Sequence, residues 1–297
     1  MEPRALDGEF DRQRDVLLAA GYPDVAGLPV TEFVALVEPL RAAVHGLAGL
    51  PDGPPAHPPF VLVVSATLIG AEQLVPLTRL AGGGAPGVLD RHHGTEGLRP
   101  YRPLPELLVP DGPVYVLVGA DRGDEFRGVP PEQALPAILR RGRTPLTIHE
   151  GIALVTQFPE LLEHNHCFTL AGSRRGDRRV PALWISGKAP KLGWCWNGNP
   201  HSWLGVASAA TRLGVTSRRG PVAHGVPPSP GAMPSAATGS APPPTAPHRP
   251  TAPHRPHSSA PPHSSAPPPQ LAPNVTSVAP SAPDVTLGAT ACRSRGG

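Results

Sequence analysis

Six basic side chains in two short turns are the first candidates for binding chemistry. They are Arg174, Arg175, Arg178, Arg179, Lys188 and Lys191, and these two lysines are the only ones in the chain. A planar guanidinium group binds phosphate or carboxylate through two parallel hydrogen bonds. The cluster therefore indicates an anion-binding site, or two separate sites, because alternate turns of a meander point to opposite ends. The competing interpretation is a solvated hairpin turn, because charge on edge strands also prevents aggregation.

Four tryptophans follow closely in the sequence: Trp184, Trp194, Trp196 and Trp203. Trp194 and Trp196 alternate with Cys195, so they share one face of a strand. If exposed, these two residues and Trp203 would form an aromatic platform for a base, a sugar or a protein partner. If buried, they would be the core of the sheet, which is the more common use of tryptophan.

Two further groups of side chains would suit an enzyme. Asp121, Asp124 and Glu125 follow an apolar strand and offer the oxygen ligands that Mg²⁺ prefers, although aspartates also simply form turns. Cys195 and His201 could form a thiol nucleophile and its base, although a cysteine inside a strand is usually an inert hydrophobic residue. The spacing of cysteines and histidines fits no zinc pattern. We expect no metal and no cofactor, and the residues leave open whether the protein is an enzyme.

The elements that position these residues follow from hydrophobic periodicity. Helices are expected over 9–20, from Thr31 with an interruption at Pro39, after Pro131, and after a capping box at Thr147–Glu150. Strands are expected over 60–65, 114–118, 167–171, 180–186 and 191–196. The last three are joined by short polar turns, as in an antiparallel meander. The order predicts an α+β fold with N-terminal helices, a mixed central sheet and a C-terminal antiparallel β-meander.

Several blocks of sequence resemble a known family. They include Gly142-Arg-Thr-Pro-Leu-Thr-Ile, Glu150-Gly-Ile-Ala-Leu-Val-Thr and Pro190-Lys-Leu-Gly-Trp-Cys-Trp-Asn-Gly-Asn-Pro-His-Ser-Trp-Leu-Gly. The chain resembles, over about residues 9–208, a family of uncharacterised actinobacterial proteins that is defined only as a domain of unknown function. The resemblance implies an intracellular protein and brings no catalytic residues with it.

The C-terminal part of the chain has a different composition. All 13 aromatic residues lie between Phe10 and Trp203, whereas residues 218–297 contain 20 prolines and short repeats such as Thr-Ala-Pro-His-Arg-Pro. We therefore expect one domain over 1–217 and a disordered, low-complexity tail over 218–297. The abrupt change also suggests a frameshifted extension that begins near residue 208, and a genuine basic tether is the alternative.

Charge and cysteine content limit the remaining possibilities. Residues 218–297 carry six basic residues and one acidic residue, so the basic pI of about 9.0 belongs mainly to the tail and argues against specific nucleic-acid binding. Three scattered cysteines, no signal peptide and no membrane-length apolar segment indicate a cytoplasmic protein. The sequence thus favours a binding module for an anionic ligand or a protein partner, through the Arg-rich hairpin and the Trp-rich meander.

Overall fold

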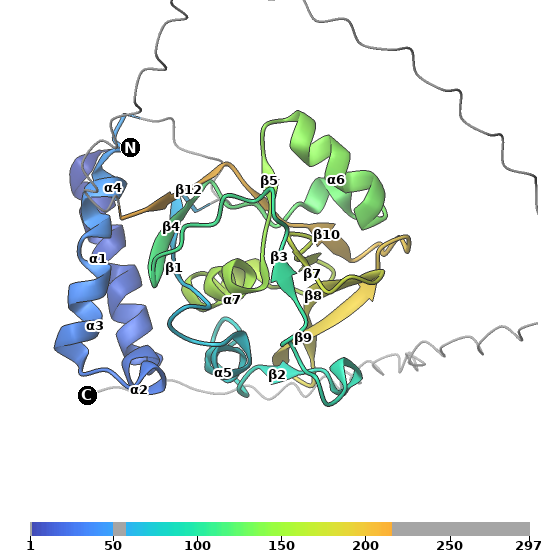
Figure 1. Cartoon of the computed structure of the whole chain (residues 1–297), viewed down its shortest axis with the longest axis horizontal. Helices are drawn as coiled ribbons and strands as arrows, with labels where there is room; N and C mark the ends of the chain where they lie inside the picture. The colour runs from blue at the N-terminus through green and yellow to red at the C-terminus, as the bar shows by residue number, and fades with distance from the viewer. Residues whose placement is uncertain (1, 50–57, 216–297) are drawn as a thin grey trace, which may run out of the picture. The chain divides into compact units, whose positions relative to one another are not determined.

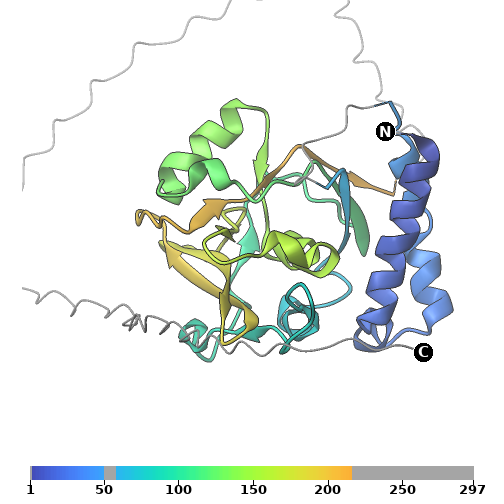
Figure 2. The same cartoon turned by 180° about the vertical axis from the view of Figure 1, so that it is seen from behind.

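The computed structural model describes residues 2–49 and 58–215, which lie in one compact unit. In Figure 1 the N-terminal helices lie along one side of a three-stranded sheet, and helix α7 (Ile148–Gln157) lies on its other side. A second sheet lies beyond α7, and Figure 2 shows the same order from behind. The predicted α+β class is confirmed. The predicted tail over 218–297 lies outside the described residues.

Four helices form the N-terminal segment: α1 (Pro3–Ala19), α2 (Tyr22–Ala26), α3 (Val30–Val37) and α4 (Leu40–His45). Gly21 follows α1 with a left-handed φ of 84°, and Pro39 separates α3 from α4, as the sequence predicts. Helix α1 begins six residues earlier than expected. Its first turn carries a proline, which is favoured there, and Leu6 extends the buried face that contains Phe10.

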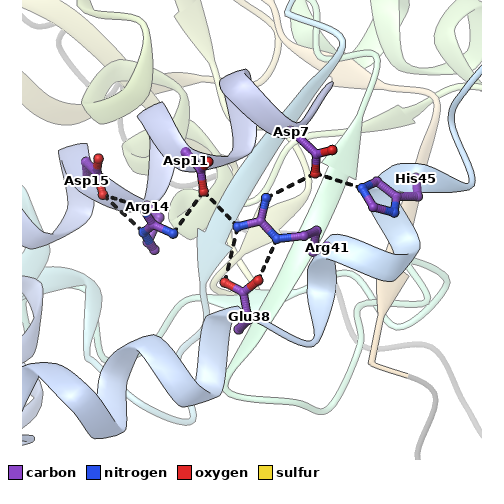
Figure 3. A network of polar contacts seen from close by, with 7 residues as sticks. All are labelled: Asp7, Asp11, Arg14, Asp15, Glu38, Arg41 and His45. Carbon is purple, nitrogen blue, oxygen red and sulfur yellow. Dashed lines mark hydrogen bonds and ion pairs between the residues drawn. The ribbon is translucent and has the colours of Figure 1, made fainter. Parts of the chain in front are cut away.

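A network of charges connects α1 with α3 and α4 (Figure 3). The guanidinium group of Arg41 binds Asp7 at 3.1 Å and Asp11 at 2.7 Å, and it also pairs with Glu38. The same group lies over the ring of Phe10, 4.3 Å from its centroid. One side chain thus covers a buried aromatic residue and joins three carboxylates that come from two parts of the chain.

The three-stranded sheet is antiparallel, in the order β1–β4–β12. Strands β1 (Phe60–Val64) and β4 (Val114–Val118) match the predicted strands, and every residue in both is buried. The third strand, β12 (Thr211–Gly214), pairs with β4 from Val118 to Tyr115. The expectation that an unrelated extension begins near residue 208 is therefore wrong, because residues 208–214 complete both this sheet and a short strand pair.

A buried ion pair fixes the last strand to the centre of the domain. Glu150 is completely buried in the first turn of α7, and its Oε2 accepts a hydrogen bond from Nη2 of Arg212 at 2.8 Å. Tyr115 donates to Oε1 at 3.0 Å, and the backbone N–H of Thr147 donates to Oε2 at 2.7 Å. The predicted capping box at Thr147 is thus confirmed, and its carboxylate also neutralises Arg212.

The second sheet has five strands in the order β10–β6–β8–β9–β2. Their bounds are β10 (Leu204–Val206), β6 (Cys167–Thr169), β8 (Arg179–Ser186), β9 (Ala189–Trp196) and β2 (Val88–Leu89). The three middle strands form the predicted antiparallel meander. The two outer strands pair parallel to their neighbours, so the sheet is mixed.

Short elements complete the described structure. The helices are α5 (Ala71–Leu74), η1 (Val75–Leu77), η2 (Arg91–His93), η3 (Asp124–Phe126), α6 (Pro131–Arg140) and η4 (Pro159–Leu161). Two-residue strands pair as β3 (Arg102–Pro103) with β7 (Ser173–Arg174), and as β5 (Thr144–Pro145) with β11 (Ser208–Ala209). Among the described helices, none is long and apolar enough to span a bilayer.

Candidate binding site

A pocket of about 660 Å³ lies between α5, the segment 98–103 and the first turn of α7. Its apolar lining comes from Ala66, Gly70, Ala71, Leu98, Pro103 and Ile148. Its polar lining comes from Glu72, Gln73, Arg99, Tyr101, Arg102, Thr147, His149 and Ser173. A concave, largely apolar site of about 300–1,000 Å³ with a few polar groups is typical of small-molecule binding.

Hydrogen bonds hold the walls of this pocket together. The hydroxyl of Ser173 accepts a hydrogen bond from the backbone N–H of Ile148 at 3.0 Å, which ties β7 to the first turn of α7. Strand β7 in turn pairs with β3, so Pro103 lies opposite Ser173. Across the pocket, Oε1 of Glu72 accepts from the backbone N–H of Leu98 at 2.6 Å. These hydrogen bonds join segments that are distant in the sequence into the walls of one pocket.

His149 contributes a neutral imidazole to the lining. Burial lowers the pKa of His149, so the ring is uncharged near neutral pH. Its Nε2 lies 3.1 Å from the carbonyl oxygen of Ile69, and a carbonyl can only accept a hydrogen bond. The proton must therefore be on Nε2, which leaves Nδ1 as a hydrogen-bond acceptor.

Two exposed guanidinium groups give the pocket its charge. Arg99 donates only to backbone carbonyls, at Thr95 and Glu96. Arg102 likewise donates to the carbonyl of Tyr101 at 2.8 Å and to that of Arg99. Within residues 2–49 and 58–215, neither arginine has a carboxylate partner. Both charges are therefore available to an anionic group in the pocket.

The predicted anion-binding arginines are engaged with nearby side chains. Arg175 binds Glu96 at 2.9 Å, and Arg175 and Arg179 both lie within 3.5 Å of the same carboxylate oxygen of Asp177, at 3.3 Å and 3.4 Å. Arg178 is 72 % exposed and lies 3.6 Å from Glu132. The side chain of Arg174 instead donates to Oδ1 of Asn197 at 2.8 Å.

The two lysines lie apart from these arginines. Lys188 occupies the turn between β8 and β9, with a left-handed φ of 59°, at the end of β8 opposite to Arg179. Lys191 pairs with Asp90 at 3.1 Å. The six cations are therefore divided between the two ends of the hairpin rather than gathered around one ligand. Anion binding by any of them stays a prediction.

Of the three tryptophans predicted to form an aromatic platform, two lie together and the third packs elsewhere, and the platform itself stays a prediction. Trp194 and Trp196 meet edge to face, with their centroids 4.8 Å apart, and Trp196 is 46 % exposed. The indole N–H of Trp194 donates to the carbonyl of His92 at 3.1 Å, which fixes its ring. Trp203 instead packs against Trp184, with a centroid distance of 6.3 Å.

The predicted carboxylates are used in ion pairs and a turn. Asp124 accepts from Nε of Arg122 at 2.9 Å and from Nδ1 of His166 at 2.8 Å, and Glu125 pairs with Arg141. Asp121 accepts from the backbone N–H of Gly123 at 2.7 Å, as in a turn. In the part of the chain that the structure describes, no group of three or more histidine, cysteine or acidic side chains could hold a metal ion.

The structure also gives no support to a thiol site. Cys195 is buried in β9, and burial raises its pKa to about 12, so the thiol stays protonated and weakly nucleophilic. The ring of His201 lies against Trp203, 5.4 Å away between centroids. The expected pairing of Cys195 with His201 finds no contact among the described residues.

Sequence reasoning missed the pocket because its lining is not contiguous. The one local signal is Arg99-Pro-Tyr-Arg-Pro103, which places two arginines, an aromatic residue and two prolines within five residues. The capping box at Thr147 was identified as a helix start, without a reason to expect a cavity beside it. The pairing of β3 with β7 and the hydrogen bond between Ser173 and Ile148 bring these segments together, and both join residues that are distant in the sequence.

Comparison with known protein families finds a match over residues 16–215, to a family of unknown function (DUF5701). The matched range includes the whole pocket and strand β12. Comparisons with curated proteins and with solved structures find no match.

Proposed function

The chain belongs to this family of unknown function, and from its geometry we propose that the protein binds a small anionic organic molecule in the pocket beside α7. The observation that carries the proposal is the combination of a cavity of about 660 Å³ with two guanidinium groups that have no carboxylate partner among the described residues. Cavities of this size are typical of small-molecule sites. The ligand class is therefore an organic acid or a phosphate ester with an apolar part.

The charges of the lining support an anion. Arg99 and Arg102 contribute two positive charges, and Glu72 contributes one negative charge. Glu72 is committed to the backbone of Leu98, and His149 is neutral. A carboxylate or phosphate could accept two parallel hydrogen bonds from either guanidinium. The remaining apolar walls would cover the carbon skeleton of the ligand.

The tip of the Arg-rich hairpin supports a second contact, with a protein partner. Trp196 is a large aromatic side chain with nearly half of its surface exposed, and Arg178 is still more exposed. Tryptophan and arginine are the residues most enriched in the energetic centres of protein interfaces. Free, buried Cys167 and Cys195 are consistent with the cytoplasmic location that we propose for both activities.

A thermal-shift screen of organic acids, phosphate esters and nucleotides would test the pocket. A ligand that binds only the folded protein, present at 100 times its Kd, adds about 2.7 kcal/mol of stability and raises Tm. The double variant Arg99→Ala/Arg102→Ala should lose this shift while it keeps the Tm of the free protein. Arg140→Ala, an exposed arginine in the last turn of α6, is the control and should keep the shift.

A ligand whose shift survives in Arg99→Ala/Arg102→Ala would contradict the proposed pocket. If the shift is instead lost in Arg178→Ala, the hairpin is the binding site, as the sequence alone suggests.

A further inference from the structure

Six of the eight buried side-chain polar atoms that lack a hydrogen-bond partner among the described residues lie around the β3–β7 strand pair. They are Nδ1 and Nε2 of His93, Oη of Tyr101, Nε and Nη1 of Arg175, and Nε of Arg179. The other two are Oδ1 of Asp124 and Oε1 of Gln157. The side chains of His93 and Tyr101 are almost completely buried, at 2 % and 6 % exposed. Because buried polar groups nearly always have partners, such a concentration needs a physical explanation.

These residues are neighbours through the pairing of β3 with β7. In that antiparallel register Arg102 lies opposite Arg174, which brings Tyr101 opposite Arg175. The guanidinium carbon of Arg175 is 5.7 Å from the centroid of the Tyr101 ring. The ring of His93, at the end of η2, meets the Tyr101 ring edge to face, also with 5.7 Å between centroids.

Nearby acceptors satisfy only part of this cluster. Asp177 lies within ion-pair distance of Nε of both Arg175 and Arg179, although not in hydrogen-bonding geometry. The backbone at Leu192 and Gly193 acts to raise the pKa of His93, but it too lies outside hydrogen-bonding geometry. Burial raises the pKa of Tyr101, and the side chain of Arg175 acts to lower it, as a donor to the Tyr101 oxygen would. Nη1 of Arg175 and Oη of Tyr101 therefore lie near each other, outside hydrogen-bonding geometry, and what the described residues do not supply is an acceptor for the O–H of Tyr101.

The unpartnered atoms are mainly donors. A guanidinium nitrogen can only donate, and burial raises the pKa of Tyr101 to about 12, so its hydroxyl keeps its proton. Burial lowers the pKa of His93, so its neutral ring offers one N–H. A cluster of buried donors stabilises an acceptor with several lone pairs, and a small oxyanion fits this description best.

The charged side chains of this cluster balance one another, so hydrogen-bond donors rather than a net positive charge would hold an anion. Arg175 and Arg179 are balanced by Glu96 and Asp177, and Asp90 near His93 is already paired with Lys191. Glu96 is largely exposed, so it weakens the local field less than a buried carboxylate would. The neutral donors Tyr101 and His93 bring no further negative charge to the cluster.

We propose that Tyr101, Arg175 and His93 form a binding site for a small oxyanion, a carboxylate or a phosphate, on the side of Tyr101 that carries Arg175. This site goes beyond the pocket, because it uses neither Arg99 nor Arg102. The two share only the ring of Tyr101, which also lines the pocket. The oxyanion is either free in solution or part of a larger molecule, and both share the same chemistry.

Isothermal titration calorimetry with inorganic phosphate and with acetate, at constant ionic strength, would test the site. The wild-type chain should bind at least one of them. Tyr101→Phe keeps the ring and removes the hydroxyl, and it should weaken binding about tenfold or more, as expected for a hydrogen bond to a charged group. Arg175→Gln should abolish binding. Arg178→Ala, in the same turn but highly exposed, is the matched control and should bind like the wild type.

The same titrations separate this site from the pocket. Arg99→Ala/Arg102→Ala should bind the oxyanion with unchanged Kd, even if it loses every pocket ligand. Circular dichroism should show the native fold for Tyr101→Phe, so this variant decides the question even if Arg175→Gln does not fold. Equal Kd values in the wild type and Tyr101→Phe would overturn the proposal, as would the absence of binding by either anion at millimolar concentration. Loss of binding in Arg99→Ala/Arg102→Ala would also overturn it, by assigning the anion to the pocket.

Discussion

Gly123 lies where two backbone segments approach closely, between Arg122 and Asp124, which both contact His166. A β-carbon at this position would lie 2.1 Å from the carbonyl oxygen of Val206, and the backbone has a left-handed φ of 76°. Gly128 has nearly the same φ, 80°, but a β-carbon there would meet no atom within 4 Å. The two glycines therefore separate the cost of the backbone conformation from the cost of a steric clash.

We predict that Gly128→Ala lowers the free energy of unfolding by about 1–2 kcal/mol, the usual cost of a left-handed residue with a side chain. Gly123→Ala should cost about 2–5 kcal/mol, because it adds overpacking against a backbone that cannot move aside freely. Urea unfolding of both variants measures the difference. Equal losses would mean that the crossing between Gly123 and Val206 is looser than the structure describes.

At the scale of elements, the features that the sequence predicts correctly are those set by residues close together along the chain. Pro39 and the capping box at Thr147 act within one or two turns of the chain, so their consequences could be predicted. The two-residue strands β3 and β7 could not be predicted, because each is defined only by its distant partner. The same limit applies to the arginines: Glu96, which binds Arg175, is 79 residues away in the sequence. The sequence shows where charged residues cluster, but it does not show which distant carboxylates neutralise them.

The contact between α1 and the α3–α4 segment should depend on pH. Hydrogen bonds from His45 and then Arg41 lower the pKa of Asp7, and the hydrogen bond from Arg41 lowers the pKa of Asp11 (Figure 3). Because the folded-state pKa lies below the ordinary value of 3.8, these carboxylates stabilise the fold above that pH. The stabilisation is lost as the pH falls through the folded-state pKa.

We therefore predict that Arg41→Met unfolds with a smaller dependence on pH below about pH 4 than the wild type. Methionine keeps an apolar side chain over Phe10, so the change removes the charge more than the packing. Urea unfolding at a series of pH values measures the slope. Arg4→Met changes an exposed arginine of α1, the helix that carries Asp7 and Asp11, and should keep the wild-type slope because Arg4 is not part of this network. If Arg41→Met and the wild type lose stability in parallel, the network does not stabilise the fold.

At the scale of the whole molecule, the question is which residues the domain needs at its C-terminal end. The family match extends to residue 215, and the described structure ends at the same residue, just after β12. Arg212 in β12 is the partner of the completely buried Glu150, whose carboxylate also caps α7 beside the pocket. Removing one member of a buried ion pair typically costs about 3–5 kcal/mol, because the other charge stays buried without a partner.

Two truncations test this boundary. A chain that ends at Ser217 should keep the Tm of the full-length protein within about 2 °C, because it retains β12 and every aromatic residue.

A chain that ends at Ala207 lacks β11, β12 and the partner of Glu150. The unpaired buried charge should cost about 3–5 kcal/mol, which is a large part of the stability of an ordinary domain. This shorter chain should therefore unfold or precipitate. Adding Glu150→Leu to the shorter chain removes the unpaired charge and should restore part of the lost solubility, which would identify the ion pair as the cause. If both truncations melt like the full-length protein, β12 contributes nothing to stability. A large loss in the Ser217 truncation would instead show that the domain needs residues beyond 217.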